Sequence, residues 1–259
     1  MPKIECNFFS ESLKLSTTMT VILPMSDGEW KKPSAKHKKM PVLWLLHGLS
    51  DDHTAWTRKT SIERYVEKRG LAVVMPEVAR SYYADMVHGL KYWTFISEEL
   101  PAVARRLFPL SEKRSENFVA GLSMGGYGAF KLALSYPERY AAAASLSGAV
   151  DPYSFLSSAN DDPNRKKDTE NIFGGLDNIK GTKNDLYTLV KNIRKNKKTF
   201  PALFQCCGTG DFLYQDNLRF RDFLKKSGVK AEYREGPGVH EWGYWDSSIQ
   251  DVLRWLPKA

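Results

Sequence analysis

Short runs of consecutive apolar residues recur along the chain, and longer stretches with the period of an amphipathic helix separate them. Apolar runs without polar alternation are typical of strands that are buried on both faces of a sheet. These runs predict strands at 42–46, 71–75, 118–120, 141–146, 202–207 and 229–234, and an alternating pattern predicts a half-buried strand at 18–23. Helical periodicity predicts helices at 61–68, 92–108, 126–136, 214–226 and 249–256. This alternation of strands and helices indicates an α/β fold with a mostly parallel central sheet flanked by helices.

The segment 151–199 interrupts the alternation. It is polar, contains the turn-forming runs Asp161-Asp162-Pro163 and Gly174-Gly175, and ends in a lysine-rich stretch. We expect it to leave the sheet as a small excursion of short helices and loops. Because function concentrates on loops over a rigid scaffold, the excursion is either a substrate-shaping lid or a surface insertion. No repeat or flexible linker divides the chain, so residues 1–259 are expected to form one domain.

One segment carries a recognisable chemical motif. Residues 121–125 read Gly-Leu-Ser-Met-Gly, which fits Gly-x-Ser-x-Gly, and they lie between a predicted strand and a predicted helix. In this setting the turn is so tight that the serine backbone is strained, and side chains at either glycine would collide. The turn exposes the hydroxyl of Ser123, and the N-terminal end of the next helix favours developing negative charge. Ser123 is therefore the predicted nucleophile, and an idle serine in a tight turn is the alternative.

A serine nucleophile needs a base, and the base needs an acid to orient it. In proteins with this motif the chain order is serine, acid, histidine, and of the five histidines only His240 follows Ser123. His240 lies in a glycine-rich loop between the last predicted strand and the last predicted helix. Asp211 directly follows an apolar strand and is the preferred acid. The alternatives are Asp216, which falls within the following helix, and Asp151, which follows an earlier strand.

Two backbone N–H groups are expected to bind the oxyanion of the tetrahedral intermediate. One belongs to Met124, the residue after the nucleophile. The other is expected from the loop after strand 42–46, where Gly48 permits the turn and the N–H of Leu49 is the candidate donor. His47 also lies in this loop, and we expect it to shape the loop and not to act as the base.

The composition excludes several classes of protein. The chain of 259 residues carries a net charge of +8, much of it in basic runs at 31–39 and 191–198. No nucleic-acid-binding module accompanies these runs, so a solvated loop and a solvated helix end are the favoured interpretation. No apolar run approaches the roughly 18 residues of a membrane span, and the N-terminus lacks the layout of a secretory signal. The three cysteines, Cys6, Cys206 and Cys207, suggest no disulfide framework or metal site, which indicates a reduced, cytoplasmic protein.

Four segments together resemble the esterase D group of α/β-hydrolases. They are His47-Gly-Leu-Ser-Asp-Asp-His-Thr-Ala-Trp56, Gly121-Leu-Ser-Met-Gly-Gly-Tyr-Gly-Ala129, Gly208-Thr-Gly-Asp211 and Gly238-Val-His-Glu-Trp242. The sequence is most similar to bacterial tributyrin esterases, in a group that includes S-formylglutathione hydrolases and some feruloyl and acetyl esterases. The resemblance implies an α/β-hydrolase fold and hydrolysis of short-chain carboxylic esters, small-molecule substrates, without a cofactor or metal. It implies that Ser123, Asp211 and His240 form the catalytic triad, with Leu49 and Met124 as oxyanion donors.

The oxyanion loop departs from S-formylglutathione hydrolases, which typically show Gly-Leu-Thr-Cys where this chain reads Gly48-Leu-Ser-Asp51. The departure favours an oxygen ester over the glutathione thioester. S-formylglutathione hydrolysis, deacetylation of sugars and feruloyl ester cleavage stay as alternatives within the enzyme class. Outside it, the alternative is an inactive binding protein of the same fold. Enzymes of this type often pair, so we expect a homo-oligomer.

Four aromatic residues near the predicted site can serve either of two purposes. Trp93, Trp242 and Trp245 fall close to predicted loops or helix starts, and Phe212 is next to Asp211. They could wall a small acyl pocket or anchor the core, since large aromatic side chains dominate protein cores.

Overall fold

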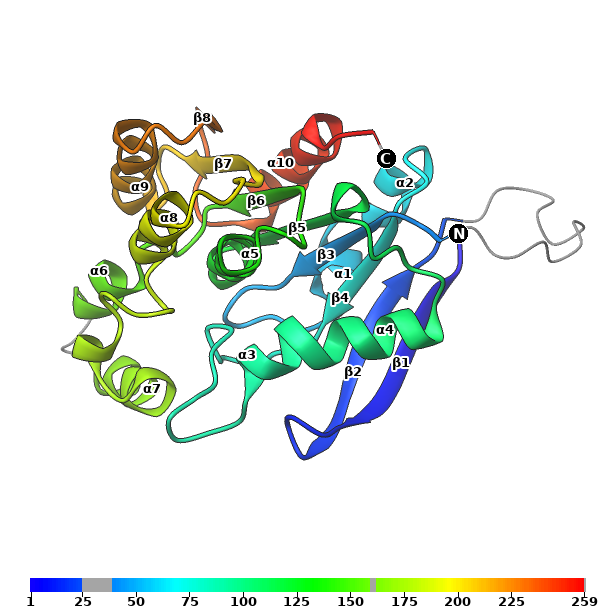
Figure 1. The fold of residues 1–259 in the computed structure, drawn as a ribbon, viewed down its shortest axis with the longest axis horizontal. Coiled ribbons are helices and arrows are strands. Elements are labelled where there is room, and N and C mark those ends of the chain that lie inside the picture. Colours follow the sequence, from blue (N-terminus) through cyan, green and yellow to red (C-terminus); the bar gives the residue numbers. More distant parts are fainter. Residues whose placement is uncertain (25–38, 159–161, 259) are drawn as a thin grey trace, which may run out of the picture.

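The computed structural model describes residues 1–24, 39–158 and 162–258, so most of the basic run at 31–39 lies outside the described residues. Eight strands form one sheet in the order β1-β2-β4-β3-β5-β6-β7-β8 (Figure 1). The strands are β1 (Lys3–Ser10), β2 (Leu15–Ile22), β3 (Val42–Leu46), β4 (Ala72–Pro76), β5 (Asn117–Leu122), β6 (Ala142–Leu146), β7 (Ala202–Gly208) and β8 (Ala231–Gly236). The pairs β1–β2 and β2–β4 are antiparallel and all other pairs are parallel. The prediction of a mostly parallel central sheet is confirmed.

Helices cover both faces of the sheet (Figure 1). One face carries α4 (Leu100–Leu107), α5 (Met124–Ser135), α8 (Leu186–Lys195) and α9 (Tyr214–Lys226). The other face carries α1 (Ala55–Lys59), α2 (Ile62–Glu67) and α10 (Trp242–Trp255). Because the central strands lie between these two layers, every residue of β3, β5 and β6 is buried, as their apolar sequences predict. The helix predicted at 92–108 is present, but it consists of α3 (Tyr92–Thr94), a π-helical turn (Phe95–Glu99) and α4.

Two elements differ from the prediction for identifiable reasons. The pattern of apolar residues predicts no element at β1, whose residues alternate between exposed and partly buried positions along the strand. Phe9 blurs that alternation in the sequence, because it is an apolar residue on the solvent side, 56% exposed. Helix α10 begins at Trp242. The apolar periodicity predicts a helix only from 249, because Gly243 and the pair 247–248 interrupt that periodicity in the first turns.

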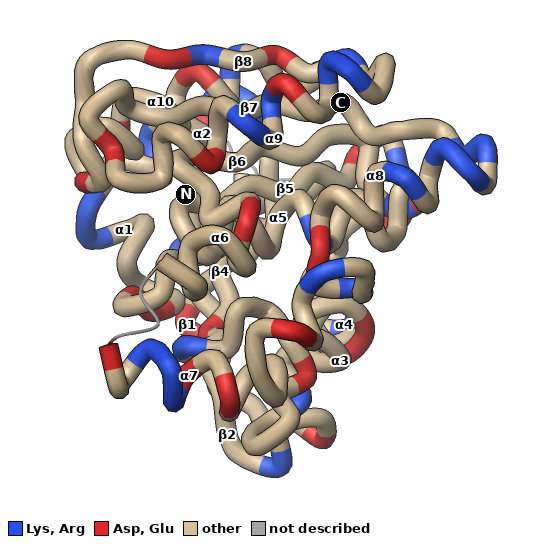
Figure 2. The backbone as a smooth tube through the Cα atoms, turned by 90° about the vertical axis from the view of Figure 1, so that its left-hand side faces the viewer, with Lys and Arg blue, Asp and Glu red and all other residues tan. Residues whose placement is uncertain are grey.

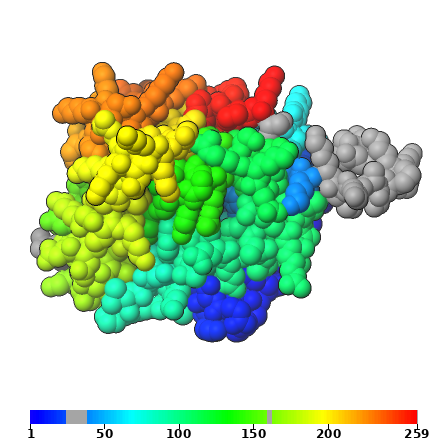
Figure 3. Space-filling view, in the orientation of Figure 1, coloured from blue at the N-terminus to red at the C-terminus, as the bar shows by residue number. Residues whose placement is uncertain are grey.

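The segment 151–199 forms short helices, as expected. Helices α6 (Pro152–Ser157) and α7 (Pro163–Phe173) lie to one side of the sheet, at the lower left of Figure 1. Helix α8 returns to the sheet and joins the main core, and in Figure 3 its yellow atoms adjoin the green atoms of α5. The basic run 191–198 occupies the exposed end of α8, where Figure 2 shows blue segments.

Candidate active site

Ser123 lies in the sharp turn between β5 and α5. Its backbone has φ 52° and ψ −120°, a conformation that is strained for a residue with a side chain. A Cβ atom on Gly121 would lie 2.4 Å from the carbonyl carbon of Gly125, and a Cβ on Gly125 would lie 2.5 Å from the Leu46 carbonyl oxygen. Both contacts are far below van der Waals separation, so this turn forms only with glycine at both positions.

The structure brings Ser123, His240 and Asp211 together, although they lie in three separate loops. The Oγ atom of Ser123 is 2.9 Å from Nε2 of His240, and Nδ1 of His240 is 2.9 Å from Oδ2 of Asp211. Because a carboxylate only accepts hydrogen bonds, Nδ1 carries the proton and Nε2 is free to accept from the serine hydroxyl. The carboxylate of Asp211 is fully buried, and its Oδ1 accepts a 2.8 Å bond from the backbone N–H of Leu213.

The two alternative acids have other partners. The carboxylate of Asp216 accepts from the hydroxyl of Ser154 at 2.9 Å and pairs with Arg219. Asp151 caps helix α6, where its Oδ1 accepts from the backbone N–H of Ser154 at 3.0 Å. Neither carboxylate is hydrogen-bonded to His240, whose Nδ1 is bonded to Asp211.

The two predicted oxyanion donors flank the nucleophile. Met124 is the first residue of α5, and the first residues of a helix have no acceptor within it. Leu49 follows Gly48, and a Cβ on Gly48 would lie 3.7 Å from Cβ of Ser123, so this loop runs directly beside the nucleophile. In the described parts of the chain, neither backbone N–H donates to a protein acceptor, which leaves both available to a substrate oxygen.

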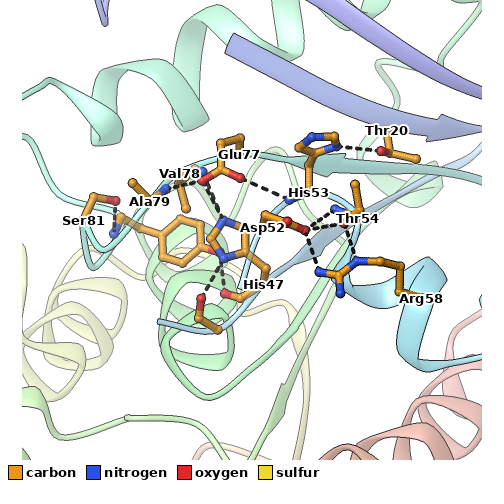
Figure 4. Close-up of polar contacts among 12 residues, drawn as sticks. Thr20, His47, Asp52, His53, Thr54, Arg58, Glu77, Val78, Ala79 and Ser81 are labelled. Atoms are coloured by element: carbon orange, nitrogen blue, oxygen red, sulfur yellow. Dashed lines mark hydrogen bonds and ion pairs between the residues drawn. The ribbon is translucent and has the colours of Figure 1, made fainter. Parts of the chain in front are cut away.

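The ring of His47 is hydrogen-bonded both to this loop and to the loop after β4 (Figure 4). Its Nδ1 lies 2.7 Å from the carbonyl oxygen of Gly48, and its Nε2 lies 3.0 Å from the backbone N–H of Val78. One partner only accepts and the other only donates, so the ring is the neutral Nδ1–H tautomer. The distance of 3.8 Å from Nε2 to Oε1 of Glu77 is therefore not an ion pair. The hydroxyl of Tyr83 adds a 2.9 Å bond to the carbonyl of His47.

Aromatic side chains surround the imidazole of His240. The ring of Trp245 meets it edge to face at 4.8 Å between centroids, and the ring of Phe212 lies 4.4 Å away. Trp245 belongs to the buried core, whereas Phe212 is 64% exposed. Trp93 is buried in the core and stacks on Tyr136. The structure therefore gives these aromatic residues different environments that the sequence could not distinguish.

An open pocket of about 420 Å³ adjoins the site at Phe212. It is lined by Ser154, Phe155, Ser158, Arg165, Phe212, Gln215, Asp216 and Arg219. The rings of Phe155 and Phe212 stack with centroids 5.8 Å apart, so an aromatic platform extends from His240 into the pocket. Helices α6 and α7 thus supply part of the wall beside the site.

Asp51, the residue that departs from the S-formylglutathione hydrolase pattern, lies in the loop beside the nucleophile. Its Oδ2 lies 2.9 Å from the position that a Cβ on Gly48 would occupy. Burial raises the pKa of this carboxyl above its ordinary value.

Among residues 1–24, 39–158 and 162–258, no group of three or more His, Cys, Asp or Glu side chains is placed to hold a metal ion. None of the described helices is long and apolar enough to cross a membrane.

An α/β-hydrolase fold with a serine, histidine and aspartate in hydrogen-bonded sequence defines a class of serine hydrolases. The family model Esterase ("Putative esterase") matches residues 10–256, and the chain belongs to this family. An acetyl esterase of Caldicellulosiruptor saccharolyticus is 31% identical over 100% of this chain and 99% of that protein. Among solved structures, the fluorophosphonate-binding serine hydrolase FphF of Staphylococcus aureus is 39% identical, with a TM-score of 0.91 and 98% of each chain covered. The S-formylglutathione hydrolase FrmB of Staphylococcus aureus is also 39% identical, with a TM-score of 0.88 and 98% of each chain covered.

Proposed function

We propose that this protein is a serine carboxylesterase that hydrolyses short-chain acyl esters through a covalent acyl-enzyme. The observation that supports it most strongly is the unbroken chain of 2.9 Å contacts from Asp211 through His240 to the hydroxyl of Ser123. An idle serine would need neither a strained turn nor a base of fixed tautomer behind it. A non-catalytic binding protein of this fold has no use for the arrangement either.

In the proposed reaction, Oγ of Ser123 attacks the ester carbonyl carbon while Nε2 of His240 takes the hydroxyl proton. Asp211 keeps the imidazole in the reactive tautomer and stabilises its positive charge. The imidazolium then gives the proton to the alcohol oxygen as the bond from carbon to that oxygen breaks. Water repeats the same steps on the acyl-enzyme and releases the carboxylic acid, so every proton returns to its starting place.

The backbone N–H groups of Leu49 and Met124 are the proposed donors to the oxyanion. Each such donor is worth about 3 kcal/mol in the transition state of related reactions. Donors fixed in the backbone need no rearrangement when charge develops, which is the basis of their effect. The N-terminal end of α5 points at the same place and adds to the favourable potential.

Esters of short acyl groups are the proposed substrates, such as tributyrin and acetyl or aryl esters. The name of the acetyl esterase relative supports this chain length. The likeness to an S-formylglutathione hydrolase makes the thioester the second candidate. Asp51 counts against it, because that carboxylate lies beside the nucleophile where the thioester enzymes typically have a cysteine.

Several broader features belong to the same proposal. The three free cysteines support a reduced compartment, and we place the enzyme in the cytoplasm. The single sheet supports one domain over the whole chain. We also propose that the segment 151–199 shapes substrate access as a lid, since it lines the pocket beside Phe212. A homo-oligomer remains our prediction from enzymes of this type.

The test compares release of p-nitrophenol from acetate, butyrate and octanoate esters by the wild type and by Ser123→Ala. Loss of a triad nucleophile lowers kcat by about 10⁶ in a comparable enzyme, so the variant should fall to background. Ser135→Ala, at the far end of the same helix, is the matched control and should retain the wild-type rate. Equal rates for the wild type and Ser123→Ala would refute the proposal, and faster turnover of S-formylglutathione than of every oxygen ester would favour the thioester.

A further inference from the structure

We propose that Asn217, on helix α9, is a positioning residue that holds the loop of the acid at a fixed place relative to the loop of the nucleophile. The proposal rests on the triad proposed above. Asn217 is fully buried and has no contact with the reacting atoms of Ser123 or His240. Its side chain nevertheless joins the two loops that carry Ser123 and Asp211.

On the nucleophile side, Nδ2 of Asn217 donates to the carbonyl oxygen of Gly148 at 2.9 Å. Gly148 lies in the loop after β6, and the backbone of Ser123 is bonded both to the last residue of β6 and to this loop. The N–H of Ser123 donates to the Leu146 carbonyl at 2.9 Å, and the N–H of Ala149 donates to the Ser123 carbonyl at 3.1 Å. The carbonyl that Asn217 binds is therefore part of the frame around the nucleophile.

On the acid side, Nδ2 of Asn217 donates to the carbonyl oxygen of Leu213 at 2.9 Å. The N–H of the same Leu213 donates to Oδ1 of Asp211 at 2.8 Å, and the N–H of Tyr214 donates to the Asp211 carbonyl at 2.9 Å. Fixing Leu213 therefore fixes one of the carboxylate's two oxygens. The other carboxylate oxygen holds His240.

Gln205 fixes the orientation of the Asn217 amide. It lies on β7 and is fully buried in an otherwise apolar strand, and its Nε2 donates to Oδ1 of Asn217 at 2.9 Å. Because Oδ1 already accepts, the amide cannot rotate by half a turn without facing a donor with a donor. The two donor hydrogens of Asn217 therefore have to point at Gly148 and Leu213. This contact gives a reason for a buried glutamine in the central sheet.

Without the Asn217 amide, the acid loop keeps its own turn but loses its bond to the frame around Ser123. Asp211 and His240 then move relative to the nucleophile by an amount that the other contacts allow. Replacing the acid of a comparable triad lowers kcat by about 10⁴, which sets the upper limit for this effect. For a displaced but intact acid we expect a fall in kcat of about 10- to 100-fold, because misplacement of about 1 Å costs up to about 100-fold.

Asn117 offers a matched control. It is also buried, and its Nδ2 also donates to two backbone carbonyls, those of Ser111 and Lys113, each at 2.9 Å. It lies at the start of β5, at the opposite end of the strand from Ser123. Asn217→Ala and Asn117→Ala thus remove the same group from two backbone carbonyls each, although Oδ1 of Asn117 also accepts from Trp44 and Arg105, and both should lower the stability of the protein. Only Asn217→Ala should lower turnover.

The experiment measures kcat and KM for p-nitrophenyl butyrate over a range of pH, for the wild type, both alanine variants and Ser123→Ala. We expect kcat of Asn217→Ala to fall 10- to 100-fold with KM within about twofold, while Asn117→Ala keeps the wild-type kcat. The acid limb of the Asn217→Ala profile should move to lower pH, because a displaced carboxylate stabilises the imidazolium less. A variant that only loses packing would shift neither the acid limb of the pH profile nor the ratio of kcat to KM.

If Asn217→Ala does not fold, Asn217→Leu tests the same role, because it fills the volume of the side chain while removing both donor hydrogens. It should lower kcat by a similar factor, and an unchanged kcat in Asn217→Leu would then overturn the proposal. In an active wild type, equal kcat for Asn217→Ala and Asn117→Ala overturns the role of Asn217 alone. A wild type no more active than Ser123→Ala overturns the proposed function, and this role with it.

Discussion

Two substitutions of His47 can separate its effect on activity from its effect on stability. In a trans peptide the C=O and N–H groups point in opposite directions within one plane. The carbonyl of Gly48 and the N–H of Leu49 belong to the same peptide, so the 2.7 Å bond from Nδ1 of His47 to that carbonyl also sets the direction of the proposed oxyanion donor. The bond from the Val78 N–H to Nε2, in contrast, only links His47 to the neighbouring loop and selects its tautomer.

The side-chain nitrogen of asparagine can occupy the place of Nδ1, and the side-chain oxygen of glutamine can occupy the place of Nε2. His47→Asn therefore keeps the bond to Gly48 and loses the bond from Val78, while His47→Gln does the reverse. His47→Asn leaves the Val78 N–H without its partner, and His47→Gln removes the shorter of the two bonds to the Gly48 carbonyl; losses of this kind cost about 1 to 3 kcal/mol of folding free energy. The two variants should be destabilised to a similar extent.

Their activities should differ. Complete loss of one oxyanion donor costs about 10² to 10³ in kcat. The Gly48 carbonyl also accepts a weaker, 3.3 Å bond from the N–H of Asp51, so part of the restraint survives in His47→Gln. For His47→Gln we expect kcat to fall about 10- to 100-fold, which corresponds to a barrier higher by about 1.4 to 2.7 kcal/mol, with KM little changed.

The assay is steady-state hydrolysis of p-nitrophenyl butyrate, paired with urea unfolding of each variant. His47→Asn should retain kcat within a few-fold of the wild type despite its lower stability. Equal losses of kcat in the two variants, or a fully active His47→Gln, would refute the peptide-plane argument.

Two further predictions concern buried titratable groups. Burial holds the pKa of Lys131 well below its ordinary value, so the unfolded chain binds an extra proton between that lowered pKa and about 10.4. The stability of the wild type should therefore rise with pH over that window. In urea unfolding, the free energy of unfolding of Lys131→Met relative to the wild type should decline from pH 7 to pH 10. A difference that stays constant with pH would contradict this direction. Burial also raises the pKa of Cys206 to about 12 and raises that of Cys207, so at pH 8 an aromatic disulfide reagent should label one thiol, the partly exposed Cys6, in the native protein and all three in denaturant. Rapid labelling of a second thiol in the native state would contradict the burial argument.

The parts of the site that local spacing controls could be predicted from the sequence. A glycine on each side of Ser123 is a local steric requirement, and the 2.4 Å and 2.5 Å contacts of added Cβ atoms show how strict it is. The chain order of acid and histidine is equally visible, because parallel strands bring their carboxyl ends to one edge of the sheet. Asp211 could be preferred over Asp216 for this reason, since it directly follows β7.

Apart from the loop-shaping role of His47, the contacts of the supporting side chains could not be predicted, because their partners are distant in sequence. Gln205 is the one signal that was available, as a polar residue inside an apolar strand. Its partner Asn217 lies in an amphipathic helix, where an asparagine ordinarily indicates the solvated face. Likewise, nothing near His47 in the sequence shows that its second nitrogen would meet the backbone of Val78.

These supporting groups share a physical task. Strained backbone gathers in the loops after β4, β5 and β6, where positive φ angles occur at Tyr82 and Tyr83, at Ser123 and at Ser147. Such conformations cost about 1 to 3 kcal/mol each and persist only where neighbouring contacts determine them fully. Backbone bonds supply part of these contacts, as at Ser123, and buried polar side chains supply others.

Lys131 donates to the carbonyl of Tyr83 at 2.8 Å, and Asn217 donates to the carbonyl of Gly148, which follows the strained Ser147. In the loop of Leu49, His47 has the same role, because its Nδ1 donates to the carbonyl of Gly48. An apolar side chain of equal volume would fill the space but could not fix the direction of a peptide plane. Burying each polar group lowers the stability of the protein through desolvation, but it fixes the positions of the nucleophile, the acid and the oxyanion donors. Apolar substitutions at these positions should consequently affect turnover more than their effect on the folding free energy suggests.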